Sequence, residues 1–244
     1  MASTPHSSDP AEPALPFAGA SGRGLRVAVV DSGVNTGHPH ILGVAGGVSI
    51  LGPDRIEENS FLDRLGHGTA VMAAIQEKAP EAEYFAVKLF QNSLRASAPA
   101  LIAAMEWALG KGVDVVNLSL GALNFEYAER FQSLVERAAA RGILVVSSRE
   151  ANGQACLPGS LAGAIGVDLD WDCPRTRYRM KQIGSDTFYV ASGYPRPAPG
   201  IPRDRNLHGS SFAVANMSGF ILRARESVPA VGIRAALARE AESL

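Results

Sequence analysis

From about residue 25 onward, two hydrophobic patterns alternate along the chain. Short, nearly continuous apolar runs predict buried strands. These strands are expected at 25–31, 84–90, 113–120, 143–148 and 163–167. Apolar residues spaced three and four apart predict helices between and after the strands. These helices are expected at 69–77, 98–109, 125–141, 211–224 and 229–241. This alternation predicts one doubly wound, mainly parallel α/β sheet with helices on both faces.

Two segments lack a clear period. Residues 1–24 are rich in Pro, Ser, Ala and Gly and predict a flexible leader, so the folded domain is expected at 25–244. Residues 168–207 predict loops and short extended pieces. The leader has neither the cationic start nor the apolar stretch of a secretory signal, and no apolar run reaches the length of a membrane span. We therefore expect a cytoplasmic protein without a membrane partner.

The composition narrows the class of protein. The chain has 244 residues, of which 46% are hydrophobic and 19% charged, a balance that argues against disorder. A formal net charge of −1 lacks the basic excess of a nucleic-acid binder, so no nucleic-acid partner is expected. Cys156 and Cys173 are too few for a disulfide framework. Two reduced thiols are expected, although a single bridge stays open, as does the oligomeric state.

Three polar residues stand where chemistry is expected in such a fold. Asp31 ends the first strand, His67 precedes a helix expected to be capped by Thr69, and Ser211 begins a buried helix. Each has a structural alternative: Asp31 could cap a turn, His67 could be a satisfied structural group, and Ser211, like Ser210, could cap its helix. Acyl transfer requires a hydroxyl, an imidazole and a carboxylate, and the order Asp, His, Ser is one that triads adopt.

The segments around these residues resemble the motifs of a known family. VAVVDSGV, GHGTAV and GSSFA resemble the Asp, His and Ser motifs of the subtilisin-like serine proteases, the subtilases. The resemblance extends over about 25–241. It implies a subtilisin-like fold in which Asp31 orients the imidazole, His67 is the general base and Ser211 is the nucleophile.

The resemblance also implies where a substrate lies. The segment AMEWALGKGVDVVNLSLG (104–121) resembles the helix and strand that lead into the backbone pairing with substrate. Ser119, Leu120 and Gly121 are expected to form this edge, which holds a peptide as an added strand. Residues 92–97 are expected to form the opposite wall.

Three positions depart from the family pattern. Ala70 stands where the family usually has a second histidine, and Ala215 where it has a proline. The oxyanion-hole asparagine of the family aligns with Ala151, and Asn152 serves in that place only if the loop is rebuilt by one residue. Loss of such a donor costs about 10²–10³ in kcat. A full hole, a weakened hole and a degenerate one all stay open.

These features predict a serine endopeptidase that carries out limited proteolysis of a particular protein or precursor peptide. The alternative is a catalytically weak or inactive pseudoprotease that binds peptides. We expect no separate propeptide domain ahead of Leu25. The segment 72–84 is too short for the calcium-binding insertion that the resemblance implies, so we expect neither metal nor cofactor. His38 and His40 have a spacing that can suit a metal, but no further ligands accompany them.

A basic region is the last feature of note. Residues 171–205 contain seven basic and three acidic side chains, a local charge of +4. Arg175, Arg177, Arg179 and Lys181 alternate, which predicts one face of an extended strand. Two interpretations stay open: a solvated edge that blocks strand pairing, or an attraction for an acidic peptide substrate or partner.

Overall fold

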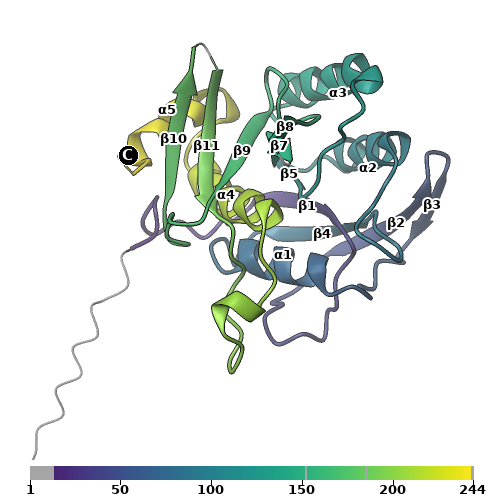
Figure 1. The fold of residues 1–244 in the computed structure, drawn as a ribbon, viewed down its shortest axis with the longest axis horizontal. Coiled ribbons are helices and arrows are strands. Elements are labelled where there is room, and N and C mark those ends of the chain that lie inside the picture. Colours follow the sequence, from purple (N-terminus) through teal and green to yellow (C-terminus); the bar gives the residue numbers. More distant parts are fainter. Residues whose placement is uncertain (1–13, 152, 185, 243–244) are drawn as a thin grey trace, which may run out of the picture.

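The structure of this chain, a computed structural model, describes residues 14–151, 153–184 and 186–242. A nine-stranded sheet runs through its centre (Figure 1). Its strands are β1 (Arg26–Asp31), β2 (Gly46–Gly52), β3 (Arg55–Glu58), β4 (Glu83–Lys88), β5 (Val115–Leu118), β6 (Leu144–Ser148), β9 (Ile165–Asp170), β10 (Tyr178–Ile183) and β11 (Asp186–Ser192). Their order is β10-β11-β9-β6-β5-β1-β4-β2-β3. All neighbours from β11 to β2 are parallel, and antiparallel pairs close both edges.

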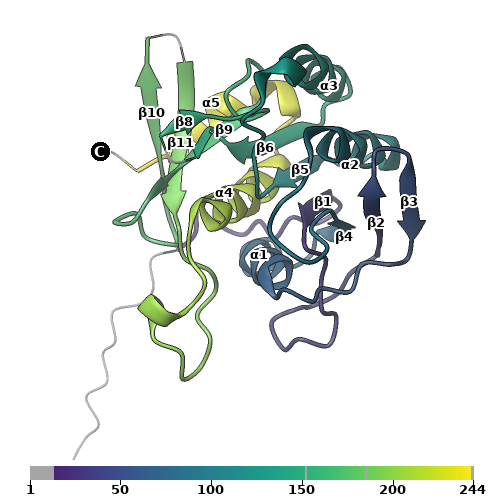
Figure 2. The same cartoon turned by 45° about the vertical axis from the view of Figure 1, so that its right-hand side comes forward.

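Five helices cover the two faces of the sheet. They are α1 (His67–Gln76), α2 (Ala98–Lys111), α3 (Ala128–Ala140), α4 (Ser210–Arg225) and α5 (Ile233–Glu240). Alternate residues of β1 show how the faces divide. Val27 and Val29 join the core formed with α1, α4 and α5, whereas Ala28 and Val30 join the core formed with α2 and α3. Figure 2 shows the same two layers. The predicted doubly wound, mainly parallel α/β fold is confirmed.

The helix boundaries differ slightly from those predicted. Ser97 caps α2 as expected, and its hydroxyl accepts a hydrogen bond from the Ala100 N–H at 3.3 Å. The helix runs past Gly110 and ends at Gly112, which has a left-handed backbone conformation. The predicted start of α1 at residue 69 is wrong, because the helix already begins at His67.

Three of the basic residues in 175–181 form ion pairs or hydrogen bonds with other segments, which a solvated edge would not require. Tyr178–Ile183 does form the edge strand β10, but Arg175 and Arg177 lie before it. Arg179 pairs with Asp170 at 2.8 Å, Arg175 pairs with Glu77, and Arg177 donates to a backbone carbonyl. These cations therefore tie the edge of the sheet to neighbouring segments.

Residues 16–23, assigned above to the leader, contact the end of the domain. The guanidinium of Arg223 donates to the carbonyls of Pro16 and Phe17, at 2.8 and 2.9 Å. Glu226 accepts hydrogen bonds from three consecutive backbone N–H groups. These donors belong to Ser21, Gly22 and Arg23. The contacts fasten this segment to α4 and to the turn after it, while the division of the chain at residue 25 stays a prediction.

Two further observations concern partners. In the three described ranges, no helix is both long and apolar enough to cross a lipid bilayer. Cys156 and Cys173 are both buried and both free.

Candidate active site

Asp31 ends β1, which lies between β5 and β4 and is parallel to both. Its side chain is fully buried. Oδ1 accepts two hydrogen bonds of 2.7 Å, one from the Ser32 backbone N–H and one from Nδ1 of His67. Within the described residues, Oδ2 is buried and has no partner. A dry carboxylate interacts strongly with the ring that it faces.

His67 is the first residue of α1, and the helix approaches Asp31 closely through Gly68. A Cβ at Gly68 would lie 2.3 Å from the carbonyl oxygen of Gly33 and 3.1 Å from Oδ1 of Asp31. Only a residue without a side chain permits this approach. Because a carboxylate only accepts hydrogen bonds, Nδ1 of His67 carries a proton and Nε2 is left as the acceptor.

Two opposing effects set the pKa of His67. Burial of the ring lowers it, because a charged imidazole loses hydration. The hydrogen bond and negative charge of Asp31, with a smaller contribution from Asp63, outweigh burial, so the pKa is raised above its ordinary value. The site therefore stabilises the imidazolium that forms when the ring accepts a proton.

Asp63 organises the turn before α1, and the sequence interpretation missed it. Its two oxygens accept five hydrogen bonds. The donors are the Ser32 hydroxyl, the backbone N–H groups of Leu65, Gly66 and Thr69, and the Thr69 hydroxyl. Burial acts to raise the pKa of Asp63, but the hydrogen bonds, first those from Thr69, lower it overall. Thr69 is thus a donor to Asp63 rather than the expected helix cap. A carboxylate shortly before the predicted helix was the sequence feature from which the role of Asp63 could have been inferred.

Ser211 is the second residue of α4, and the start of this helix packs against His67. The rings of Phe212 and His67 have centroids 5.5 Å apart. The Ser211 hydroxyl donates to the carbonyl of Ser119 at 2.9 Å, and among the described contacts no hydrogen bond joins it to His67. Neither Ser210 nor Ser211 caps α4 through its side chain. The capping alternative for these serines is therefore not observed.

The segment after β5 lies beside Ser211, and its role as the substrate edge stays a prediction. Ser119 offers its carbonyl to Ser211, and the carbonyl of Leu120 accepts from the Ser147 hydroxyl at 3.2 Å. Behind Gly121 lies the side chain of Cys156, which a Cβ at Gly121 would meet at 2.3 Å. Ala122 and Leu157 then exchange two backbone hydrogen bonds of 2.8 and 2.9 Å. The edge is thus supported from behind, and the expected wall 92–97 is exposed.

The loop after β6 carries the expected oxyanion donor. Glu150–Ala151 (β7) and Gln154–Ala155 (β8) form a short antiparallel ladder. Asn152 lies outside the described residues, so its role stays a prediction. The loop is anchored at Arg149, whose guanidinium pairs with Asp168 at 3.0 Å and lies 4.2 Å from the centre of the Phe188 ring.

Metal ligands are not grouped in the part of the chain that the structure describes. No three His, Cys, Asp or Glu side chains gather there in a cluster suited to a metal ion. The rings of His38 and His40 lie edge to face, with centroids 5.1 Å apart. Of the two family departures, Ala215 is buried within α4, whereas Ala70 is half-buried and borders a cavity.

A buried Asp–His pair with a serine at the adjoining helix start, at the carboxyl end of a parallel sheet, is the arrangement of an α/β serine peptidase. The chain belongs to the subtilase family, whose profile matches residues 22–166. It is a serine-type endopeptidase, and its substrates are peptides or proteins.

Comparison with individual proteins supports the assignment. Over 95% of its length, the chain is 33% identical to subtilisin Savinase from Lederbergia lenta and covers 88% of that protein. It is also 33% identical to an alkaline protease from Alkalihalobacillus alcalophilus, covering 95% of this chain and 63% of that one. Subtilisin E from Bacillus subtilis (strain 168) is 33% identical over 84% of the chain.

Proposed function

We propose that this protein cleaves a particular protein or precursor peptide through an acyl-enzyme, with Ser211 as nucleophile, His67 as general base and Asp31 as the group that orients His67. The observation that carries the proposal is the buried 2.7 Å hydrogen bond between Asp31 and His67, with the start of α4 packed against the ring. It supplies a fixed tautomer and a stabilised imidazolium beside a serine.

The reaction begins when the Ser211 hydroxyl turns from the Ser119 carbonyl toward Nε2 of His67. Oγ attacks the scissile carbonyl carbon while its proton passes to Nε2. His67 then gives this proton to the leaving amine, and the C–N bond breaks. Water hydrolyses the resulting ester by the same route. The N–H groups at the start of α4, together with the helix dipole, favour the oxyanion, and Asn152 is proposed as a second donor.

The substrate is proposed to pair with Ser119, Leu120 and Gly121 as an added strand. Exposed apolar side chains occur in the proposed opposite wall and in the chain that follows the edge. Leu94 on the opposite wall is 51% exposed, and Leu123 and Phe125 beyond the edge are each 50% exposed. These side chains favour apolar residues on the acyl side of the scissile bond, which supports a selective protease.

One observation favours the alternative, a peptide-binding pseudoprotease. The Ser211 hydroxyl donates to the Ser119 carbonyl, which competes with His67 for the same proton. A fluorophosphonate probe distinguishes the two functions, because it reacts only with an activated serine. We expect the protein to be labelled, Ser211→Ala to lose labelling, and Ser210→Ala, the matched control one residue earlier, to keep it. A folded protein that stays unlabelled between about pH 6 and 9 supports the pseudoprotease and contradicts the enzyme.

We also propose that the enzyme works in the cytoplasm without metal or cofactor, and without nucleic-acid or membrane partners. The near-neutral net charge supports the absence of a nucleic-acid partner. Peptide hydrolysis and thermal stability are expected to be unchanged by EDTA. A fall in either that added calcium restores would contradict the proposal.

A further inference from the structure

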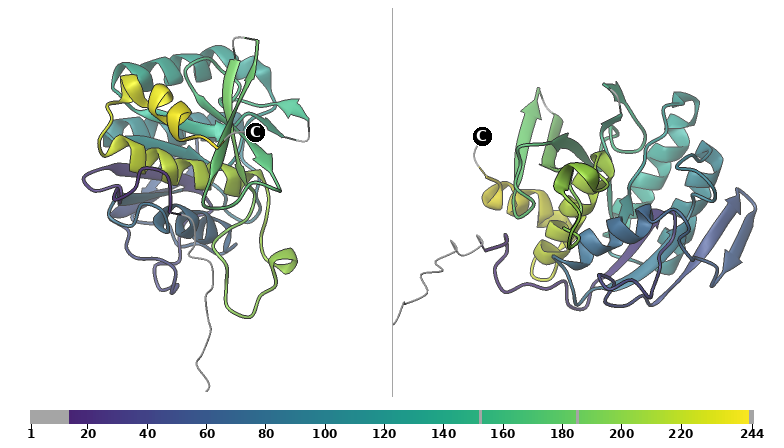
Figure 3. Two further views of the ribbon diagram at one scale, coloured as in Figure 1. Left: turned by 90° about the vertical axis from the view of Figure 1, so that its left-hand side faces the viewer. Right: turned by 60° about the horizontal axis from the view of Figure 1, so that its bottom comes forward.

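A cavity of about 300 Å³ lies beside the proposed active site, on the side of the sheet that α1 and α4 cover. Its walls come from the loop after β1, from one side of α1 and from the long loop between β11 and α4. This last loop projects from the body of the protein (Figure 3). Ala70, which replaces the second histidine expected from the family motif, lies in the wall formed by α1.

The wall contains one carboxylate, that of Asp63, and this group is fully engaged. Its five hydrogen bonds come from Leu65 and Gly66 in the turn before α1, from Thr69 in the first turn of α1, and from Ser32. It therefore has little capacity to pair with a cation across the cavity.

Much of the rest of the wall is apolar, and its polar side chains are mainly hydrogen-bond donors. Arg196 is half-buried and, among the described contacts, has no ion pair or side-chain hydrogen bond. Asn35 and Asn206 use their side-chain oxygens to accept from the backbone N–H groups of Gly37 and Leu207. No described hydrogen bond uses the two amide NH₂ groups, so both remain as donors.

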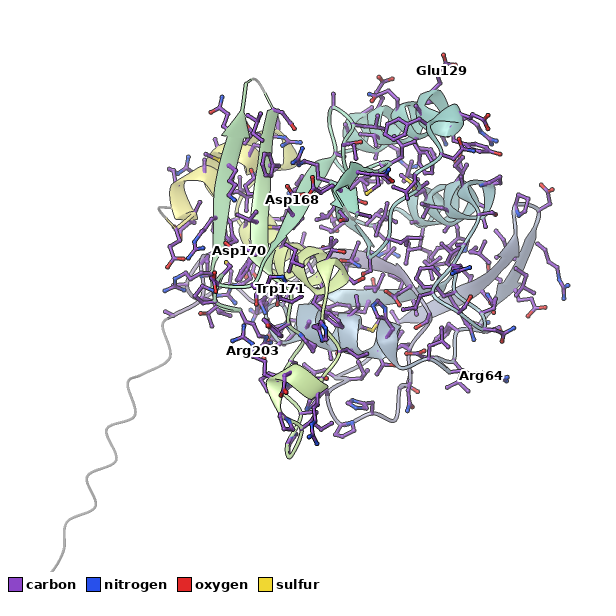
Figure 4. All side chains as sticks on the ribbon, in the orientation of Figure 1. Arg64, Glu129, Asp168, Asp170, Trp171 and Arg203 are labelled. Carbon is purple, nitrogen blue, oxygen red and sulfur yellow. The ribbon has the colours of Figure 1, made fainter. Side chains whose placement is uncertain are left out.

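The two histidines of the wall lie against each other, with ring centroids 5.1 Å apart. Burial lowers the pKa of His40, and the charges of Arg196 and His38 lower it further. Nδ1 of His38 accepts from the His40 backbone N–H at 3.2 Å. Among the other cations nearby, Arg203 stacks on the Tyr194 ring at 3.6 Å and lies apart from Arg64 (Figure 4), which is itself part of the cavity wall. The wall therefore contains two arginines, and Arg196 is the one that acts on His40 and is supplied by the loop between β11 and α4.

The cavity lies within reach of a bound substrate. Gly66 in its wall precedes His67 directly, and Leu207 lies four residues before Ser211. The proposed substrate edge after β5 leads instead to α3, on the other face of the sheet. A peptide that enters along this edge and crosses the catalytic centre thus reaches the cavity with its leaving-group side. An extended chain advances about 3.3 Å per residue, so the first four residues after the scissile bond extend roughly 13 Å from it and are the candidates for binding in the cavity.

We propose that this cavity binds a carboxylate of the substrate, that of an Asp or Glu among the first residues C-terminal to the scissile bond. Arg196 pairs with the carboxylate, and the amide groups of Asn35 and Asn206 donate to it. The inference rests on the proposed function, because that function places the peptide. Of the two interpretations left open for the basic region 171–205, the proposal favours an attraction for acidic peptides, with Arg196 as the cation.

The test measures binding separately from catalysis. Acetylated and amidated peptides carry Glu at each of the first four positions after the expected cleavage site, and matched peptides carry Gln there. Fluorescence anisotropy with the Ser211→Ala variant reports their affinities without turnover. One Glu peptide is expected to bind about ten-fold tighter than its Gln partner, the effect of a charge-assisted hydrogen bond. Arg196→Gln is expected to remove this difference, and Arg130→Gln on α3 to leave it.

Equal affinities for every Glu and Gln pair would overturn the inference, as would a preference that Arg196→Gln retains. A third outcome would also overturn the substrate role. If free acetate abolishes the preference for Glu peptides in binding, and the active enzyme shows no such preference in kcat/KM, the cavity binds free carboxylates instead. Failure of the proposed function reads out differently: the fluorophosphonate probe does not label Ser211, whatever the peptide affinities.

Discussion

Replacement of Gly68 by alanine tests whether close contact between α1 and the Asp31 turn sets the catalytic geometry. In an ordinary helix, Gly→Ala stabilises a protein by about 0.5–1 kcal/mol because it restricts the unfolded chain. At Gly68 the new Cβ would lie 2.3 Å from the Gly33 carbonyl oxygen and 3.0 Å from the Ser32 backbone nitrogen. Both contacts are with backbone, which no side-chain rotation relieves.

The size of the effect follows from the distances. Cβ atoms essentially never come closer than 3.0 Å to another heavy atom, so helix and turn must separate by about 0.7 Å at the shortest contact. Overpacking of this kind costs about 1–3 kcal/mol, which exceeds the helix gain. The separation also lengthens the 2.7 Å bond between His67 and Asp31. Displacements near 1 Å at a catalytic centre cost about 10²-fold in rate.

The assay compares kcat/KM for a fluorogenic peptide with the free energy of unfolding in urea. Gly68→Ala is expected to lower both. Gly110→Ala is the matched control, because it is also helical and its Cβ would meet nothing within 4 Å. That variant is expected to keep full activity and unchanged or higher stability. Wild-type activity and stability in Gly68→Ala would refute the argument that this contact positions the pair.

Three further predictions follow from buried titratable groups. Asp31→Asn removes the charge that raises the pKa of His67, so kcat is expected to fall by about 10⁴ and the acidic limb of the kcat/KM–pH profile to move to lower pH; an unmoved limb would contradict this. Burial raises the pKa of both Cys156 and Cys173 to about 11, so a disulfide reagent at about pH 8 is expected to modify neither thiol until the protein unfolds; rapid modification of folded protein would contradict the burial. Burial lowers the pKa of Lys78 from 10.5 to about 8, so between these values the unfolded chain binds more protons and Lys78 makes stability rise with pH. Lys78→Met is expected to lack this rise of stability with pH and to be more stable than the wild type below pH 8 by roughly 1–3 kcal/mol. Urea unfolding at several pH values measures the difference, and an identical pH profile in both proteins would exclude the effect.

Strands that form continuous apolar runs were predictable from sequence, whereas exposed strands were not. The largely buried strands β2 and β11 were also missed, because glycines and polar residues interrupt the apolar positions of β2 and leave β11 only a short apolar run. The segment 26–31 is apolar at nearly every position because helices cover both of its sides, and it forms β1 as expected. Arg55–Glu58 is exposed at every residue, so β3 carries no hydrophobic period. Tyr178–Ile183 mixes one buried residue with partly and fully exposed ones, and β10 was accordingly expected only as an extended piece.

The site was predictable as far as short motifs reach. Asp31 and His67 stand in motifs that place them at a strand end and a helix start, and they meet as expected. The cavity beside them was not foreseen, because its walls come from segments about 160 residues apart in sequence. Only the fold brings Arg196 near His40. Likewise, the sequence around Asp63 does not predict its hydrogen bond with the Ser32 hydroxyl, which lies 31 residues earlier in the chain.

The clasp between residues 16–23 and the end of α4 has a consequence for synthesis on the ribosome. Pro16 leaves the ribosomal exit tunnel early, but its carbonyl has no Arg223 to accept from until about 200 more residues have been translated. Ser211 arrives in the same late stretch of the nascent chain. The contact between residues 16–23 and α4 therefore forms only after Ser211 has also been synthesised. An unfinished polypeptide contains Asp31 and His67 but lacks the proposed nucleophile, so it cannot cleave neighbouring chains.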